Sequence, residues 1–249
     1  MAETITSVNN DIVKLAASLE QKKFRDETGL FLLEGKKPIE EAIKAGVEIE
    51  KLFSLKEESI NAKESYIVTE SVMKKISTTQ TPPNITAIAK KKNYNLEQLN
   101  GKTVLLLENI KDPGNLGTII RTAAALGAHL IVLTGDCVDL YNPKVIRSAT
   151  GNIFKVPVVY SNDWEQMRHQ FRNHKFIGTI LDPDKHPIDL NKVNFNMPTV
   201  IMFGSEANGL SSTAMKYVHE YIKIPLQNEV ESLNLAISAG IILYKALVH

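Results

Sequence analysis

The second half of the chain alternates short, almost continuous apolar runs with segments in which apolar and polar residues are mixed. The pattern predicts strands at residues 104–110, 129–134, 156–160, 176–181, 199–204 and 221–226, and helices at 116–127, 142–150, 163–171 and 231–247. Strands that lack polar alternation are buried on both faces, which is typical of a parallel sheet covered by helices. We therefore expect an α/β fold with a mostly parallel sheet. The last helix is apolar nearly all round, so it should be largely buried, in a core or a subunit interface.

Residues 1–95 carry a less regular pattern, which predicts a separate small α/β unit of about 90 residues. The elements expected there are helices at 6–25, 38–45 and 70–76 and strands at 30–33, 49–55, 66–68 and 84–89. The polar stretch 90–102 is the expected linker region, because few of its side chains could be buried. The sequence thus predicts a small domain at 1–95, a linker at 96–102 and a larger domain at 103–249.

Composition excludes several classes of protein. The chain has 249 residues, 43% of them hydrophobic, which is enough for packed cores, and its single cysteine, Cys137, has no partner for an intramolecular disulfide. The polar amino-terminal residues do not resemble a secretory signal, and no apolar run approaches the roughly 20 residues needed to span a bilayer. The six histidines show no zinc-binding spacing. We expect a cytoplasmic protein with no membrane segment and no metal.

The net charge of +1 neither favours nor excludes a nucleic-acid partner. Two local clusters could meet phosphates: Lys22, Lys23 and Arg25, and the run at 90–92. A solvated face or a linker is the more common explanation for either cluster alone.

Three segments place Gly or Asn bends and a few polar groups against apolar strands or helices: 115–121, 203–211 and 224–240. Ligands bind at the carboxyl ends of strands in open α/β sheets, so these segments predict one composite site. The turn at 112–117 lacks the glycine spacing of a dinucleotide fingerprint. The segment 204–211 has P-loop spacing, but Leu210 replaces the phosphate-binding lysine. The segment carries the acidic residue Glu206 and no basic residue, so it suits a neutral or cationic ligand.

Five polar residues in these segments are candidates for chemistry, and each has a plainer explanation. Asn115 is expected at an N-cap position, and Arg121 lies more than one turn further along an otherwise small and apolar helix. Asn115 could serve only as a cap and Arg121 could form a local ion pair. Ser232 and Asn234 repeat the pattern at the start of the last helix, where Ser232 could be only the cap. Glu206 could merely accept hydrogen bonds from neighbouring amides.

Taken together, the three segments resemble the signature of the SpoU/TrmH family of RNA ribose 2′-O-methyltransferases in the SPOUT superfamily. The matching motifs are NLGTIIRTAAALG, VIMFGSEANGLS and IPLQNEVESLNLAISAG, in the family's order and spacing. The resemblance is strong over 103–249. It is weaker over 1–95, where SVNNDIVKLAASL and FLLEG look like the family's substrate-binding extension, which is similar to L30e-like RNA-binding modules.

The resemblance implies S-adenosylmethionine as the cofactor, bound by backbone groups in a deep trefoil knot that pattern reading alone would not propose. By motif position the cofactor-contacting residues would be Gly204, Ile224 and Leu233, with Thr179 as a further candidate. The family also implies a homodimer with its site at the subunit interface, and RNA as the partner.

The chemistry of the candidate residues agrees with methyl transfer. The methyl group of a sulfonium is already activated, so the enzyme must align a ribose hydroxyl and stabilise the developing alkoxide. A guanidinium stays protonated at neutral pH, so we assign Arg121 to phosphate positioning and alkoxide stabilisation rather than to general base catalysis. Asn115, Ser232 and Asn234 would hold the ribose and Arg121, and Glu206 would orient them. The N-terminal domain favours 23S rRNA as the substrate. The alternatives are tRNA, methylation of a base, and a non-catalytic RNA-binding or ribosome-assembly protein on the same fold.

Overall fold

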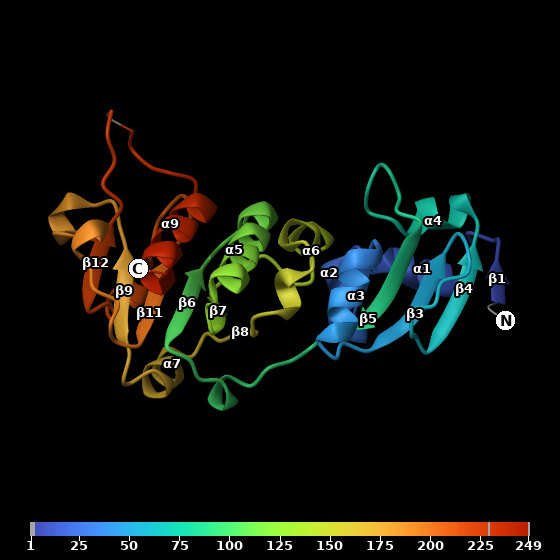
Figure 1. The fold of residues 1–249 in the computed structure, drawn as a ribbon, viewed down its shortest axis with the longest axis horizontal. Helices are drawn as coiled ribbons and strands as arrows, with labels where there is room; N and C mark the ends of the chain where they lie inside the picture. Colours follow the sequence, from blue (N-terminus) through green and yellow to red (C-terminus); the bar gives the residue numbers. More distant parts are fainter. Residues whose placement is uncertain (1–2, 229, 249) are drawn as a thin grey trace. The chain divides into compact units, whose positions relative to one another are not determined.

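The computed structural model describes residues 3–228 and 230–248, and the chain divides into two compact units (Figure 1). The N-terminal unit consists of residues 1–92 together with 139–154, and the C-terminal unit consists of residues 93–138 together with 155–249. The segment 139–154 lies within the range that the sequence pattern assigns to the larger domain. The N-terminal unit is therefore discontinuous in sequence.

The N-terminal unit is built on a five-stranded mixed sheet with the order β1-β4-β3-β5-β2. The strands are β1 (Glu3–Ile5), β2 (Leu30–Glu34), β3 (Ile49–Ser54), β4 (Glu64–Val68) and β5 (Ile85–Lys90). The helices are α1 (Asp11–Ser18), α2 (Lys22–Thr28), α3 (Lys36–Lys44), α4 (Glu70–Ile76) and α6 (Pro143–Ala149), and a 3-10 turn, η2, spans Asn152–Phe154. Strand β5 runs antiparallel to β2 and β3, whereas β4 is parallel to β1 and β3. A small α/β unit is present, as predicted.

The single helix predicted at 6–25 is wrong, because the segment forms two helices. Asn10 caps α1 by accepting the N–H of Ile12 at 2.8 Å, and the chain turns between α1 and α2. The carbonyls of Leu19 and Glu20 in that turn accept hydrogen bonds from Arg25 Nη1 at 2.8 and 2.6 Å. These two hydrogen bonds stabilise the break between the helices. Arg25 is itself held by Asp139, which is distant in sequence and so cannot be inferred from local periodicity.

The partner of Arg25 is Asp139, from the second segment of the same unit. Arg25 Nη2 lies 2.5 Å and Nε 2.7 Å from Asp139 Oδ2, and the two side chains are only 2% and 9% exposed. Nearby, the ring of Phe31 contacts those of Tyr141 and Phe154 at centroid distances of 4.5 and 6.2 Å. A hydrogen-bonded ion pair and an aromatic cluster therefore hold segment 139–154 in this unit.

The C-terminal unit has a seven-stranded sheet with the order β10-β12-β9-β11-β6-β7-β8, and every neighbouring pair is parallel. The strands are β6 (Thr103–Glu108), β7 (Leu130–Thr134), β8 (Val158–Tyr160), β9 (Lys175–Thr179), β10 (Ile188–Asp189), β11 (Thr199–Phe203) and β12 (Glu220–Lys223). Strands β6, β7 and β11 are buried along their whole length, as expected for the centre of a parallel sheet. The predicted α/β class is confirmed.

In the part of this unit that the structure describes, four helices and three 3-10 turns accompany the sheet. They are α5 (Pro113–Leu126), α7 (Trp164–Gln170), α8 (Ser212–Met215), α9 (Leu235–Val248), η1 (Leu96–Gln98), η3 (Pro183–Lys185) and η4 (Leu190–Lys192). Helices α5 and α9 pack side by side (Figure 1). Leu96 in η1 is buried in the core of this unit, although the sequence pattern predicts a solvated stretch there. None of the helices that the structure describes has the length and apolar character needed to cross a membrane.

Helix α9 is buried on one side only. Ala236, Ala239, Ile242 and Leu243 are buried, whereas Ile237, Ile241, Tyr244 and Val248 are 39–56% exposed. The exposed residues follow the spacing i, i+4, i+7, i+11, so they form one apolar stripe along the helix, which we call the α9 stripe. The expected burial, in a core or a subunit interface, is thus present on one side of the helix within a single chain.

Replacing Asp139 with alanine should lower the free energy of unfolding by about 3–5 kcal/mol, because it leaves the buried guanidinium of Arg25 without its counter-charge. Urea unfolding followed by circular dichroism measures the effect. The matched control is Lys22→Ala, which removes the ion pair between Lys22 and Asp26. These side chains are 65% and 47% exposed, so the free energy of unfolding should fall by less than about 1 kcal/mol. Equal losses in the two variants would contradict a fastening role for the buried pair.

Candidate active site

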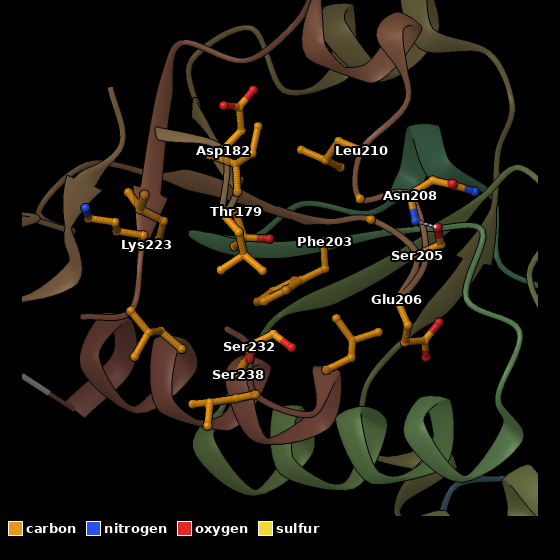
Figure 2. Close-up of a pocket in the computed structure, with 18 of the residues that line it drawn as sticks. Thr179, Asp182, Phe203, Ser205, Glu206, Asn208, Leu210, Lys223, Ser232 and Ser238 are labelled. Carbon is orange, nitrogen blue, oxygen red and sulfur yellow. Dashed lines mark hydrogen bonds between the residues drawn. The ribbon is translucent and has the colours of Figure 1, made fainter. Parts of the chain in front are cut away.

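A cavity of about 630 Å³ opens where β12, β9 and β11 end (Figure 2). These strands are neighbours in the parallel sheet, so their carboxyl ends share one edge, where ligands of open α/β sheets bind. The lining comes from the ends of the three strands and the loops that follow them, with Met215 and the start of α9. The volume is in the range of small-molecule and cofactor sites, about 300–1,000 Å³.

The wall that follows β11 is a tight turn of backbone. Ser205 and Gly209 exchange two hydrogen bonds, at 3.1 and 2.9 Å, so that residues 205–209 close on themselves, and we call this segment the 205–209 turn. A Cβ on Gly204 would lie 1.9 Å from the carbonyl carbon of Gly209, and Gly209 itself has a φ of +63°. Both glycines are therefore required for the turn that carries Glu206.

One asparagine joins the three motif segments. Asn115 Nδ2 donates to Glu206 Oε1 at 2.7 Å, and Asn115 Oδ1 accepts from Asn234 Nδ2 at 3.0 Å. Asn234 Oδ1 accepts from the amides of Ala236 and Ile237 at the start of α9, at 2.9 and 3.3 Å. Glu206 Oε1 can only accept when ionised, which fixes the direction of the whole chain of hydrogen bonds. The composite site expected from the three segments is thus assembled in the structure.

The prediction that Asn115 caps its helix is wrong. Asp112 is the N-cap of α5 and accepts the Asn115 N–H at 2.7 Å, with Pro113 at the first helical position. Because Asp112 performs this task, the Asn115 side chain is available to bridge Glu206 and Asn234. At α9 the cap is Asn234 rather than Ser232.

The loop that leads into α5 is clamped by the segment that follows β7. Val138 N–H donates to the Ile110 carbonyl at 2.8 Å, and the Ile110 N–H donates to Cys137 Sγ at 3.3 Å. Burial raises the pKa of the Cys137 thiol, which favours its neutral form. These contacts fix the entry to α5 and hence the position of Asn115.

Most of the predicted site residues meet at the cavity. The lining includes Thr179, Gly204, Glu206, Ile224, Ser232, Leu233 and Asn234. Figure 2 shows Thr179 and Phe203 in the middle of the site, with Ser232 on the α9 side and Glu206 across from it. Thr179 Oγ1 donates to the Met202 carbonyl at 3.0 Å, so its hydroxyl is occupied within the sheet.

Arg121 lies apart from this group. It follows Asn115 by six residues, which places it about 9 Å further along α5 and about 120° around its axis. Arg121 is exposed, as are Thr118 and Ala125 on the same side of the helix. Within residues 3–228 and 230–248, the cavity lining does not include Arg121. A single copy of the chain therefore keeps this cation on the outer side of α5.

The sequence pattern did not single out Asp182, Ser238 or Glu108. Asp182 and Ser238 line the cavity. Glu108 ends the apolar run of β6 and binds Ser211 just beyond the 205–209 turn. An acid closing an otherwise apolar strand is a signal that could have identified Glu108.

The lining fits S-adenosylmethionine. Phe203, Leu210, Ile222 and Leu226 provide apolar surface for an adenine ring, while Glu206 and Asp182 supply carboxylates that suit a sulfonium and an ammonium. No group of three or more His, Cys, Asp or Glu that could hold a metal ion occurs in the described part of the chain.

Comparison with known proteins gives the same result. Residues 102–244 match the SpoU rRNA Methylase family, and residues 10–87 match the MRM3-like substrate binding domain. The 23S rRNA (guanosine(2553)-2′-O)-methyltransferase RlmP of Bacillus subtilis is 30% identical, over 96% of this chain and 97% of that protein. The 23S rRNA (uridine(2479)-2′-O)-methyltransferase of Streptomyces viridochromogenes is also 30% identical, over 99% and 92%. A crystal structure of an AdoMet-bound rRNA methyltransferase from Sinorhizobium meliloti superposes with a TM-score of 0.90, at 31% identity and over 98% and 97% of the two chains.

The family match, together with the AdoMet-bound structure of the same fold, identifies an S-adenosylmethionine-dependent RNA methyltransferase with its cavity at the carboxyl edge of the parallel sheet. The chain belongs to the SpoU rRNA methylase family, since the match covers more than half of its length. The resemblance noted in the sequence is thereby confirmed.

Replacing Gly204 with alanine should weaken S-adenosylmethionine binding at least about tenfold, because the new Cβ collides with the backbone of Gly209 and the turn must move. Isothermal titration calorimetry measures the dissociation constant. The matched control is Gly240→Ala, whose Cβ would meet Thr122 Cγ2 at an ordinary 3.6 Å and should leave binding unchanged. Unaltered affinity in Gly204→Ala would rule out the 205–209 turn as a cofactor wall.

Proposed function

We propose that this chain transfers the methyl group of S-adenosylmethionine to the 2′-oxygen of a ribose in 23S rRNA. The observation that carries the proposal is the chain of hydrogen bonds from Asn234 through Asn115 to Glu206 at the rim of a cofactor-sized cavity. The relatives from Bacillus subtilis and Streptomyces viridochromogenes are both named as 2′-O-methyltransferases of 23S rRNA, and the N-terminal unit matches a substrate-binding domain. They act on a guanosine and a uridine, so the target nucleotide depends on RNA shape rather than on the fold.

The residues of the site have distinct tasks in this reaction. When bound, S-adenosylmethionine supplies a methyl carbon on a cationic sulfur, which departs as a neutral thioether while the new carbon–oxygen bond forms. Asn115, Ser232 and Asn234 orient the ribose by hydrogen bonds, and Glu206 holds Asn115 in the required orientation. Arg121 positions a phosphate and stabilises the oxygen as its proton leaves for the RNA phosphate or water.

The task of Arg121 requires a second copy of the chain. Arg121 lies on the outer side of α5, and the neighbouring α9 stripe presents four apolar side chains to solvent. A homodimer through the C-terminal unit covers the stripe and brings Arg121 of one copy toward the cavity of the other. Such a pairing is isologous, so both sites are completed by the same contact.

Other parts of the proposal rest on family membership. We assign RNA recognition to the domain at 1–95, methyl transfer to 103–249 and a linking role to 96–102. The proposal also includes a trefoil knot around the cofactor site and a cytoplasmic location. The alternative is a tRNA 2′-O-methyltransferase. The presence of Asn115, Arg121, Glu206, Ser232 and Asn234 favours catalysis.

Incubation of the protein with isotope-labelled S-adenosylmethionine and ribosomal RNA should yield labelled RNA in which a 2′-O-methyl nucleoside carries the label. Nuclease digestion and mass spectrometry distinguish ribose from base methylation, and a parallel incubation with tRNA tests the choice of substrate. Label in tRNA alone, label on a base, or no label at all would each refute the proposed reaction.

Replacing Arg121 with alanine should reduce methyl transfer at least about a hundredfold, since the developing charge on oxygen loses its cation, while cofactor affinity stays close to normal. Mixed dimers show which copy supplies Arg121. Arg121→Ala and Gly204→Ala subunits are mixed after mild dissociation and assayed at an S-adenosylmethionine concentration too low to fill the Gly204→Ala cavity. They should recover about a quarter of wild-type activity, because half of the dimers carry one intact site. No recovery despite subunit exchange would mean that Arg121 acts within its own chain.

A further inference from the structure

Glu108 is a buried acid that lies outside the cavity lining. It is the last residue of β6 and only 4% exposed. Its Oε2 accepts the Ser211 N–H at 2.7 Å and its Oε1 accepts the Ser211 hydroxyl at 2.6 Å. In the described part of the chain, both hydrogen bonds of this carboxylate therefore come from one residue, Ser211, and no ion pair joins it.

A buried carboxylate costs free energy unless its hydrogen bonds are strong, and bonds to an ionised oxygen are roughly twice as strong as neutral ones. Two such bonds at one residue fix both the backbone and the side chain of Ser211. Ser211 in turn accepts the Ala214 N–H at 3.1 Å and so caps α8. The start of α8 is thereby tied to the end of β6.

The 205–209 turn lies just before Ser211 in the chain, so the hydrogen bonds from Ser211 to Glu108 also restrain that turn. The 205–209 turn is closed internally by the two Ser205–Gly209 hydrogen bonds, so its backbone forms one unit between Gly204 and Leu210. On one side Glu206 holds it to Asn115 of α5, and on the other Ser211 holds it to Glu108 of β6. Strand β6 and helix α5 are consecutive in the chain. One strand–loop–helix unit therefore forms both of these contacts, one through Asn115 and one through Glu108.

We propose that Glu108 is a positioning residue that sets the cavity wall at 204–211 and, through Glu206, the orientation of Asn115. This inference rests on the proposed function for its catalytic part only. Its effect on the cavity itself concerns cofactor binding, which is measured without RNA.

The experiment compares Glu108→Leu, which keeps the size of the side chain and removes both acceptors, with Glu108→Gln, which keeps one acceptor and a polar partner for the Ser211 hydroxyl. The control is Val104→Ala, four residues earlier on β6 and fully buried, which destabilises the same strand near its amino end, away from the cavity. Calorimetry with S-adenosylmethionine gives the dissociation constant, single-turnover and steady-state methyl transfer give kcat and KM for RNA, and thermal unfolding gives stability.

Glu108→Leu should raise the dissociation constant for S-adenosylmethionine and lower kcat, each at least about tenfold, with little change in KM for RNA. Glu108→Gln should recover both to within about threefold of wild type. Val104→Ala should lower the unfolding temperature while cofactor affinity and kcat stay near normal. If Glu108→Leu does not fold, Ser211→Ala replaces it, with the same directions expected.

Cofactor affinity and kcat that stay normal in the folded Glu108→Leu or Ser211→Ala variant would overturn the proposal. The proposal also fails if Val104→Ala reproduces their losses, since the role of Glu108 would then be general stability. A wild-type protein that binds S-adenosylmethionine but transfers no methyl to rRNA refutes the proposed function instead, and the affinity series still decides the role of Glu108.

Discussion

The side-chain amide of Asn115 is the interaction on which the site depends. It donates to Glu206 and accepts from Asn234, so one group joins segments that are 91 and 119 residues away in the chain. This bridge requires that the end of β11, the start of α5 and the start of α9 lie together, and the parallel sheet provides that arrangement. The tight backbone turn after β11 holds Glu206 in place, and the Asp112 cap of α5 holds Asn115.

Much of the C-terminal unit could be predicted from sequence because its strands are buried on both faces and therefore appear as unbroken apolar runs. The convergence of the motif segments could also be predicted, since parallel strands end at one edge of a sheet. Two Asx residues within four positions of each other, Asp112 and Asn115, could not be ranked as caps from sequence alone. Packing decided between them, because the Asn115 side chain bonds the distant Glu206 and Asn234, whereas the Asp112 side chain accepts the nearby Asn115 N–H.

Other features were hidden for definite physical reasons. Strand β1 has three residues, two of them polar and exposed, so it carries no periodic signal. The break between α1 and α2 depends on Arg25, whose buried partner lies 114 residues later. The exposed side of α9 could not be read from periodicity, because a helix that is apolar all round has no polar face to mark its surface. In each case tertiary contacts, rather than local preference, determine the outcome.

Segment 139–154 has a consequence for how such a protein can be rearranged. The chain passes from one unit to the other at 92–93, 138–139 and 154–155, so three covalent crossings connect them. A recombination event that exchanged only the first 92 residues would strip Tyr141 and Phe154 of the aromatic partner they contact, and would leave Asp139 without a guanidinium. The N-terminal unit therefore cannot be exchanged as residues 1–92 alone. Segment 139–154, which lies in the sequence between two parts of the C-terminal unit, would have to be exchanged with it.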